Sequence, residues 1–108
     1  MVSTDSPIKW TPWKSEKDPV KRKILTKLGE EAGELVAASM RCLAQGIEEC
    51  EPETGKPNRE WLEDELADVW AGMLLSISGF QLDLARIQKR ANDKVAYLKQ
   101  WHEADDGS

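Results

Sequence analysis

The sequence predicts an all-α fold, and three observations support this prediction. Apolar residues recur at helical spacing in three long segments, no segment alternates polar and apolar residues as a strand would, and the prolines lie outside the interiors of these segments. With 108 residues the chain is expected to be one domain, residues 1–108, with a poor ratio of volume to surface. We therefore expect a small helical bundle of about three main helices, completed by oligomerisation.

The expected elements begin with an extended N-terminal arm over residues 1–17, which mix two prolines, three lysines and two tryptophans without periodicity. A helical core is expected over residues 18–101. Asp18 is a suitable N-cap and Pro19 fits the first helical position, so the first helix should run from there to Gly46. Its apolar positions are Ile24, Leu25, Leu28, Ala32, Leu35, Val36 and Leu43.

Residues 47–57 hold two prolines and a glycine among several acids, and predict a loop. Asn58 is the expected cap of the second helix, which should end near Gly79. The third helix is expected over residues 83–101, with residues 102–108 as a polar, frayed tail. The positions expected to be buried in these two helices are Leu62, Leu66, Val69, Trp70, Met73, Leu74, Ile77, Leu84, Ile87, Ala91, Val95 and Leu98.

Two pairs of acids lie inside these apolar patterns, which is the best clue to function. Glu31 with Glu34, and Glu65 with Asp68, are three residues apart, so each pair shares one helix face beside the packing surface. Burying unpaired charge is costly, so such a cluster needs protonation, basic partners or a bound cation. An all-oxygen site suits Mg²⁺ or Mn²⁺. The alternative is two solvated faces in a chain with 32% charged residues.

The composition argues against several partners. A net charge of −5 and a pI near 4.9 disfavour a nucleic-acid polymer or an anionic membrane as the main partner. The first residues contain no apolar signal region and the longest apolar stretch is interrupted, so we expect a cytoplasmic protein without a membrane segment. Cys42 and Cys50 have neither CxxC spacing nor a neighbouring histidine, and are expected to be reduced thiols without a metal role.

Several kinds of catalytic site are disfavoured by missing motifs. The sequence has neither a GxxxxGK[ST] loop nor a GxGxxG turn, so phosphate binding, if present, must be based on a metal. A di-iron bundle pairs glutamate with histidine three residues later, whereas the one histidine, His102, is far from both acidic pairs. A serine or cysteine nucleophile would also need a histidine base, so covalent catalysis is disfavoured.

The segment Lys27–Leu35, KLGEEAGEL, followed by ELADV at residues 65–69, resembles the MazG-like family of all-α nucleoside triphosphate pyrophosphohydrolases, which is marked by EExxE followed by ExxD. The segment GFQLDLA at residues 79–85, with Lys89 after it, is similar to the family's Gly-Ile-Asp-Leu segment and basic third helix. The resemblance covers roughly residues 18–95. The chain departs from the pattern at Asp93, where relatives often carry asparagine, and at Gly72, where a tyrosine is often found.

The resemblance implies that Glu31, Glu34, Glu65 and Asp68 hold Mg²⁺, with Mn²⁺ as an alternative, and that the metal binds the triphosphate. The α–β bond would be hydrolysed to give a nucleoside monophosphate and pyrophosphate. Either Glu30 or Glu34 would orient the attacking water as general base, with a solvated surface residue as the alternative for Glu30.

Three polar residues and two tryptophans complete the site that the resemblance implies. Lys89, Asn92 and Lys27 are the candidates for phosphate binding, with a surface lysine as the alternative for Lys89. Trp13, with Trp10 in reserve, is the candidate for stacking on the base, although both tryptophans fit equally well as contacts that fix the arm to a neighbouring subunit.

The leading hypothesis is therefore a Mg²⁺-dependent enzyme that cleaves (d)NTP to (d)NMP and pyrophosphate, in a house-cleaning or nucleotide-pool role. Its nucleoside triphosphate site would be completed in a homodimer or a dimer-of-dimers tetramer. Two alternatives remain open: an enzyme like the related phosphoribosyl-ATP pyrophosphohydrolase, and a non-catalytic helical oligomerisation module whose acidic clusters are surface charge.

Overall fold

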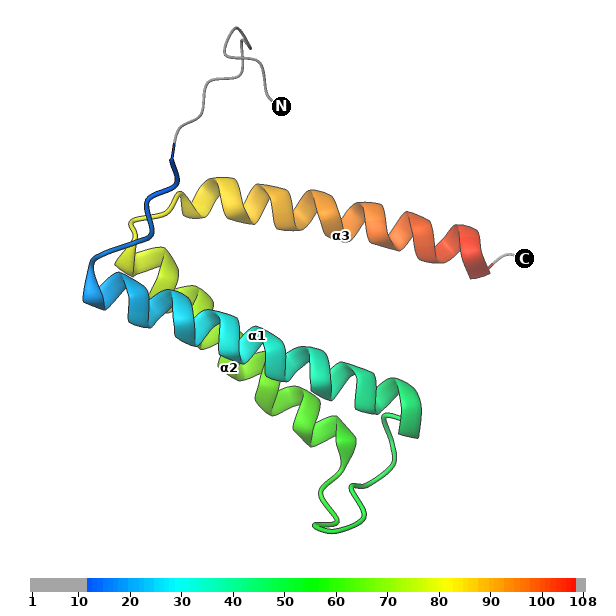
Figure 1. The fold of residues 1–108 in the computed structure, drawn as a ribbon. Helices are drawn as coiled ribbons and strands as arrows, with labels where there is room; N and C mark the ends of the chain where they lie inside the picture. Colours follow the sequence, from blue (N-terminus) through cyan, green and yellow to red (C-terminus); the bar gives the residue numbers. More distant parts are fainter. Residues whose placement is uncertain (1–11, 107–108) are drawn as a thin grey trace, which may run out of the picture.

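The computed structural model describes residues 12–106, which form three α-helices (Figure 1). Helix α1 spans Pro19–Gln45, α2 spans Asn58–Gly79 and α3 spans Leu84–Asp106. The one β-type contact in this part of the chain is an isolated bridge between Cys50 and Pro57. The predicted all-α class and the order of the helices are confirmed.

Both ends of α1 follow the residue types that predicted them. The Asp18 carboxylate accepts a hydrogen bond from the backbone N–H of Val20 at 3.0 Å, and Pro19 occupies the first helical turn. At the other end Gly46 adopts a φ of +107°, which a residue with a side chain rarely adopts, and its N–H donates to the Cys42 carbonyl at 2.9 Å. The local chemistry of the cap residues therefore fixes the bounds of α1.

The start of α2 differs from the prediction, because Pro57 and not Asn58 occupies the cap position. Asn58 lies in the helix with no exposed surface, and its side-chain amide donates to the Gly46 carbonyl at 2.9 Å and to Gln45 Oε1 at 3.3 Å. The Cys42 thiol lies 3.7 Å from the Asn58 carbonyl oxygen. Asn58 thus connects the end of α1 to the start of α2 from inside the structure.

The loop between α1 and α2 is organised around the carboxylate of Glu51. This carboxylate accepts hydrogen bonds from the hydroxyl and backbone N–H of Thr54, both at 2.7 Å, and from the backbone N–H of Glu53 at 3.0 Å. The side-chain bond from Thr54, followed by the two backbone bonds, holds the pKa of Glu51 below its ordinary value. The loop therefore folds back on itself and places Lys56 beside the first turns of α2, where its ammonium pairs with Asp64.

Helices α1 and α2 run antiparallel and form the one extensive contact between helices in the described residues (Figure 1). Two glycines of α2 lie where the helices approach closely. A Cβ at Gly72 would lie 3.2 Å from Leu28 Cδ1, and one at Gly79 would lie 2.7 Å from Ile24 Cδ1. The glycine that replaces the family's frequent tyrosine therefore sits directly on the contact between α1 and α2.

Helix α3 is separate from this pair. Asp83 begins it by accepting a hydrogen bond from the Arg86 backbone N–H at 3.0 Å, and the helix continues to Asp106, beyond the end predicted at residue 101. The contacts of α3 with α1 and α2 are almost absent. The radius of gyration is 20.0 Å, compared with about 13 Å for a compact domain of 100 residues.

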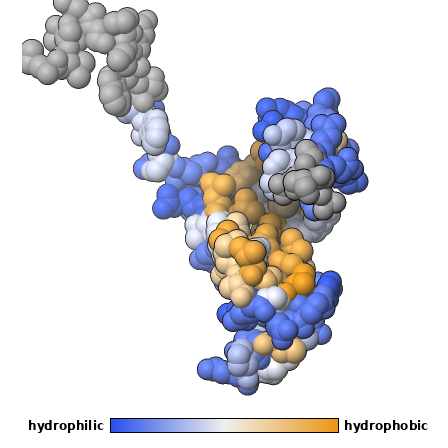
Figure 2. Space-filling model, turned by 90° about the vertical axis from the view of Figure 1, so that its right-hand side faces the viewer, coloured by the Kyte–Doolittle hydropathy of each residue, from blue (hydrophilic) through white to orange (hydrophobic). Residues whose placement is uncertain are grey.

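A single chain consequently has a very small core. Ile24 and Ala38 are its buried apolar side chains, and the predicted burial of the apolar faces of α2 and α3 is wrong for one chain alone. Figure 2 shows hydrophobic residues gathered in the middle of one face, flanked by hydrophilic ones. The large apolar side chains that remain at least one third exposed include Val36, Met40, Leu43, Leu66, Trp70, Leu74, Leu84, Val95, Leu98 and Trp101.

The buried amide of Asn58 generates a test of how the two helices are joined. Asn58→Asp keeps the shape of the side chain but replaces its donor by an acceptor, which then faces the two acceptor oxygens of Gly46 and Gln45. We expect a loss of about 1–3 kcal/mol in the free energy of unfolding, measured by urea denaturation. Asn92→Asp makes the same chemical change at an exposed position of α3, and an equal loss in that control would contradict the assignment.

Candidate metal centre

The four carboxylates predicted from the sequence converge in the structure. Glu31 and Glu34 come from α1, Glu65 and Asp68 come from α2, and one carboxylate oxygen of each lies within 4.8 Å of the others. Each pair lies on one face of its helix, and the packing of α1 against α2 brings the two pairs together. The spacing within each helix and the pairing of the helices together produce the four-carboxylate cluster.

Two oxygens of this cluster are buried without any hydrogen-bond partner among the described residues. Glu31 is 8% exposed; its Oε1 lies 3.1 Å from the Lys27 ammonium, but its Oε2 has no donor. Oε2 of Glu65 is buried in the same way on the other helix. An unsatisfied buried carboxylate oxygen is costly, and a divalent cation between the helices would satisfy both. The residues present therefore fit a divalent metal ion.

Two pKa values at the cluster are raised above their ordinary values. Burial, followed by repulsion from Glu34 and Asp68, raises the pKa of Glu65 above its ordinary value. The hydrogen bond to Glu31 and the attraction of that carboxylate raise the pKa of Lys27. In the part of the chain that the structure describes, Lys27 is the one cation in an ion pair with these four acids, so the cluster has a large excess of negative charge.

Two cavities border the cluster. One of about 270 Å³ is lined by Lys27, Glu31, Asp68, Ala71, Gly72 and Leu75. The other, of about 330 Å³, is lined by Glu34, Ala37, Ala38, Arg41, Trp61 and Glu65. A ligand bound at the carboxylates would therefore extend into one cavity or into both.

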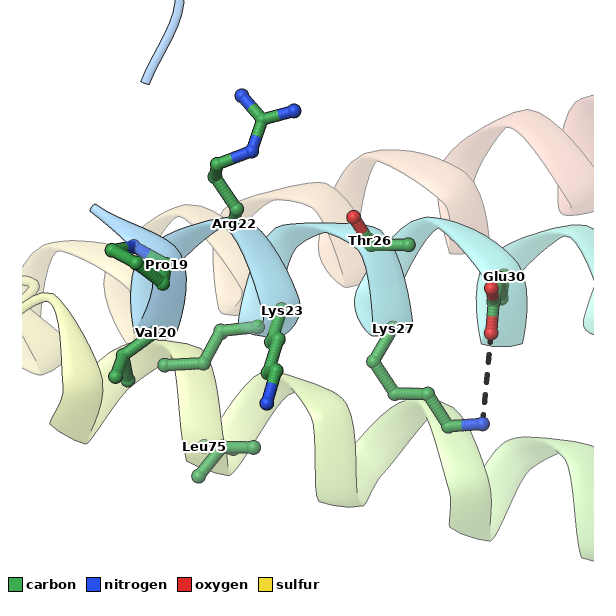
Figure 3. Close-up of a pocket in the computed structure, with 9 residues that line it drawn as sticks. Pro19, Val20, Arg22, Lys23, Thr26, Lys27, Glu30 and Leu75 are labelled. Carbon is green, nitrogen blue, oxygen red and sulfur yellow. Dashed lines mark ion pairs between the residues drawn. The ribbon is translucent and has the colours of Figure 1, made fainter. Parts of the chain in front are cut away.

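Glu30 lies outside the four-carboxylate cluster. It is exposed, and its carboxylate lies 3.6 Å from the Lys27 ammonium (Figure 3). Both residues border a hollow of about 860 Å³ along the first turns of α1. This hollow touches the acidic centre only through Lys27. The structure thus separates Glu30 from Glu34, the other candidate for general base.

The remaining predicted site residues are not brought to the cluster within one chain. Lys89 pairs with Asp93 at 2.8 Å and borders a hollow lined entirely by α3, and Asn92 is exposed on the same helix. Trp13 is 99% exposed. Trp10 lies outside the described residues. Of the three phosphate candidates, only Lys27 contacts the acidic centre, through its ion pair with Glu31.

Two residues beside the carboxylates were not singled out as site residues by the sequence analysis. Trp61 reads as a packing residue of the second helix, yet it is half-buried beside Glu65, with the Lys56 ammonium 4.2 Å and the Arg41 guanidinium 5.4 Å from its ring centre. The sequence spacing of these two residues from the acidic pairs could have indicated their place. Arg41 follows Glu34 by two helical turns and Trp61 precedes Glu65 by one, so each shares a face with an acid.

Comparison with known proteins identifies one family. Residues 3–94 match the family model described as phosphoribosyl-ATP pyrophosphohydrolase. No curated protein and no solved structure gives a significant match to the chain. Separately, none of the helices within residues 12–106 has the length and apolar character needed to cross a membrane.

The raised pKa of Glu65 predicts how a neutral variant behaves without metal. The folded protein binds a proton at Glu65 more tightly than the unfolded chain, so stability falls as pH rises from the ordinary value of 4.5 through the raised pKa. In EDTA at pH 7 we therefore expect Glu65→Gln to melt at a higher temperature than the wild type. The difference should shrink as the pH is lowered toward 4.5.

Mg²⁺ should reverse this order. An ion that binds only the folded state raises the melting temperature, and once the ion concentration exceeds the Kd the rise follows the logarithm of that concentration. Glu65→Gln removes one of the four carboxylates of the cluster, so this variant should gain less from Mg²⁺ than the wild type. Glu63→Gln removes the same charge from an exposed position of α2 and is the matched control. If the control shifts as much as Glu65→Gln in either condition, the effects arise from net charge and not from the cluster.

Proposed function

Since the chain belongs to the phosphoribosyl-ATP pyrophosphohydrolase family, a hydrolase family of the MazG-like superfamily, we propose that it cleaves the α–β phosphoric anhydride bond of a nucleoside triphosphate. Pyrophosphohydrolases of this family generally depend on divalent metal ions. The observation that carries the proposal is the four-carboxylate cluster with its two orphaned buried oxygens. The products would be a nucleoside monophosphate and pyrophosphate.

The proposed ligands of Mg²⁺ are Glu31, Glu34, Glu65 and Asp68, with Mn²⁺ as an alternative ion. Bound there, the ion would neutralise phosphate oxygens that the carboxylates alone would repel. The protein's own contribution is to hold four acids in place before substrate arrives, because their positions are set by two packed helices and not by a mobile loop.

Glu34 is the better supported general base. It belongs to the cluster, is exposed, and borders the cavity that also contains Arg41 and Trp61, so a water molecule can reach it. Glu30 is not part of the cluster, and its carboxylate lies 3.6 Å from the Lys27 ammonium. In the proposed reaction the water oxygen bonds to the α-phosphorus, its proton passes to Glu34, and the bridging oxygen departs with the β-phosphate.

The substrate is one of two nucleoside triphosphates in the proposal. Canonical (d)NTPs fit a house-cleaning or nucleotide-pool enzyme, while the description of the matched family favours phosphoribosyl-ATP. Both offer the same triphosphate to the acidic centre and differ at the nucleoside. The family match favours either enzyme over the non-catalytic oligomerisation module.

The exposed apolar faces support the proposal of a homodimer or a dimer of dimers. Apolar side chains on all three helices remain exposed, and α3 makes almost no contact with the other helices of residues 12–106. Their exposure in water is costly, and a second copy provides matching apolar surface. In such an assembly, Lys89 and Asn92 would reach phosphates at the cluster of another copy, since they do not reach their own.

A substrate panel tests the proposed reaction. With Mg²⁺ present, we expect the wild type to convert either canonical (d)NTPs or phosphoribosyl-ATP into monophosphate and pyrophosphate, measured by chromatography of both products. Glu31→Gln, which changes a buried ligand, should lower kcat/KM at least about 100-fold, while Glu63→Gln should leave it unchanged. Release of orthophosphate in place of pyrophosphate would contradict attack at the α–β bond.

Substitutions on the exposed apolar face of α3 test the proposed oligomer. The double variant Val95→Asp with Leu98→Asp places two charges on its exposed apolar stripe, and we expect a shift toward monomer in size-exclusion chromatography with light scattering. Gln100→Asp, on the opposite side of α3 by helical spacing, should leave the mass unchanged. A wild-type protein that is monomeric at micromolar concentration would overturn the proposed assembly.

A further inference from the structure

The cavity bordered by Arg41 and Trp61 is the strongest unassigned feature of the molecule. It has a volume of about 330 Å³ and shares Glu34 and Glu65 with the four-carboxylate cluster. A substrate group that leaves the metal centre on this side enters the cavity directly. The chemistry of its walls therefore indicates which part of the substrate lies there.

Arg41 supplies a cation that the described residues do not neutralise. It is half-buried, and in this part of the chain its guanidinium takes part in none of the ion pairs or hydrogen bonds. Its charge contributes weakly to the lowered pKa of Glu51, but the oxygens of that carboxylate are bonded to Thr54 and Glu53. A guanidinium has five N–H donors in a planar arrangement that matches phosphate.

Trp61 adds a second unused donor beside Arg41. Its indole Nε1 is buried without a hydrogen-bond partner among the described residues. Two cations, Lys56 and Arg41, already lie over the ring, and the ammonium of Lys56 is paired with Asp64. A base that stacks on this ring would compete with these cations, whereas the free indole N–H and the guanidinium both suit an acceptor-rich anion.

The cavity on the other side of the cluster has a different character. There Lys27 is committed to Glu31 and Glu30, and the remaining wall includes Ala71, Gly72 and Leu75. It thus offers apolar surface and space, without an unpaired cation. The two cavities give the acidic centre one end suited to phosphate and one end suited to a less charged group.

We propose that the Arg41 and Trp61 cavity binds the β- and γ-phosphates of the substrate and receives the pyrophosphate that leaves, while the nucleoside extends toward Gly72. This inference rests on the proposed function. As water adds to the α-phosphorus and its proton passes to the carboxylate base, the bond from the α-phosphorus to the bridging oxygen breaks. The electron pair of that bond stays on pyrophosphate, and Arg41 stabilises the charge that develops there.

The test compares the two products as ligands. Isothermal titration calorimetry in Mg²⁺ measures the Kd of inorganic pyrophosphate and of AMP for the wild type, Arg41→Gln and Trp61→Phe. We expect the Kd of pyrophosphate to rise about tenfold or more in Arg41→Gln and by a smaller factor in Trp61→Phe, which keeps the ring but loses the N–H. The Kd of AMP should stay unchanged in both.

Two further variants separate this role from a structural one. Arg22→Gln removes an exposed arginine from the first turns of α1 and should change neither Kd. Arg41→Lys keeps a positive charge, should fold if Arg41→Gln does not, and should recover part of the pyrophosphate affinity. Circular dichroism melting of each variant checks that the helices are intact.

The outcomes distinguish this inference from the proposed function. Weaker binding of AMP with unchanged binding of pyrophosphate would place the nucleoside in this cavity and overturn the inference, and unchanged binding of both would overturn it as well. Hydrolysis of nucleotides by the wild type in either case would leave the proposed function standing. A wild type that hydrolyses no nucleotide would reject the proposed function, whatever the binding data show.

Discussion

The mutual repulsion of four carboxylates at the contact of α1 and α2 is the constraint on which the rest of the structure depends. One carboxylate oxygen of each residue lies within 4.8 Å of the others, and two oxygens of the cluster are buried without partners among the described residues. Lys27 is the one described cation that forms an ion pair with these four acids. Such an arrangement opposes the packing of the two helices. Other groups must therefore stabilise the contact between α1 and α2. A cation bound at the four carboxylates would replace their repulsion by attraction to the ion.

The groups that oppose this repulsion lie at both ends of the cluster. Asn58 joins α1 to α2 at one end through bonds to Gln45 and Gly46, and Ile24 packs against Gly79 at the other. Between them Gly72 lets α2 approach Leu28. The site is thus positioned by the contacts of rigid helices, which is the arrangement that holds metal ligands most accurately.

Much of this was predictable from the sequence, because it depends on neighbours along the chain. Asp18, Pro19 and Gly46 set the bounds of α1, and the spacing of three residues placed each acidic pair on one face. What could not be predicted depends on the pairing of helices. Asparagine suits a helix cap and a buried bridge equally well, so its sequence position alone does not show which role Asn58 has. An amphipathic pattern likewise predicts that α3 buries an apolar face, but it does not show that α3 makes almost no contact with α1 and α2 of the same chain.

X-ray diffraction from crystals grown with Mn²⁺ shows whether the four carboxylates together bind a divalent ion. Anomalous scattering locates manganese without reference to any assumed site. We expect an anomalous peak between α1 and α2, about 2.2 Å from oxygens of Glu31, Glu34, Glu65 and Asp68. Manganese bound only elsewhere, with these four side chains turned apart into solvent, would contradict it.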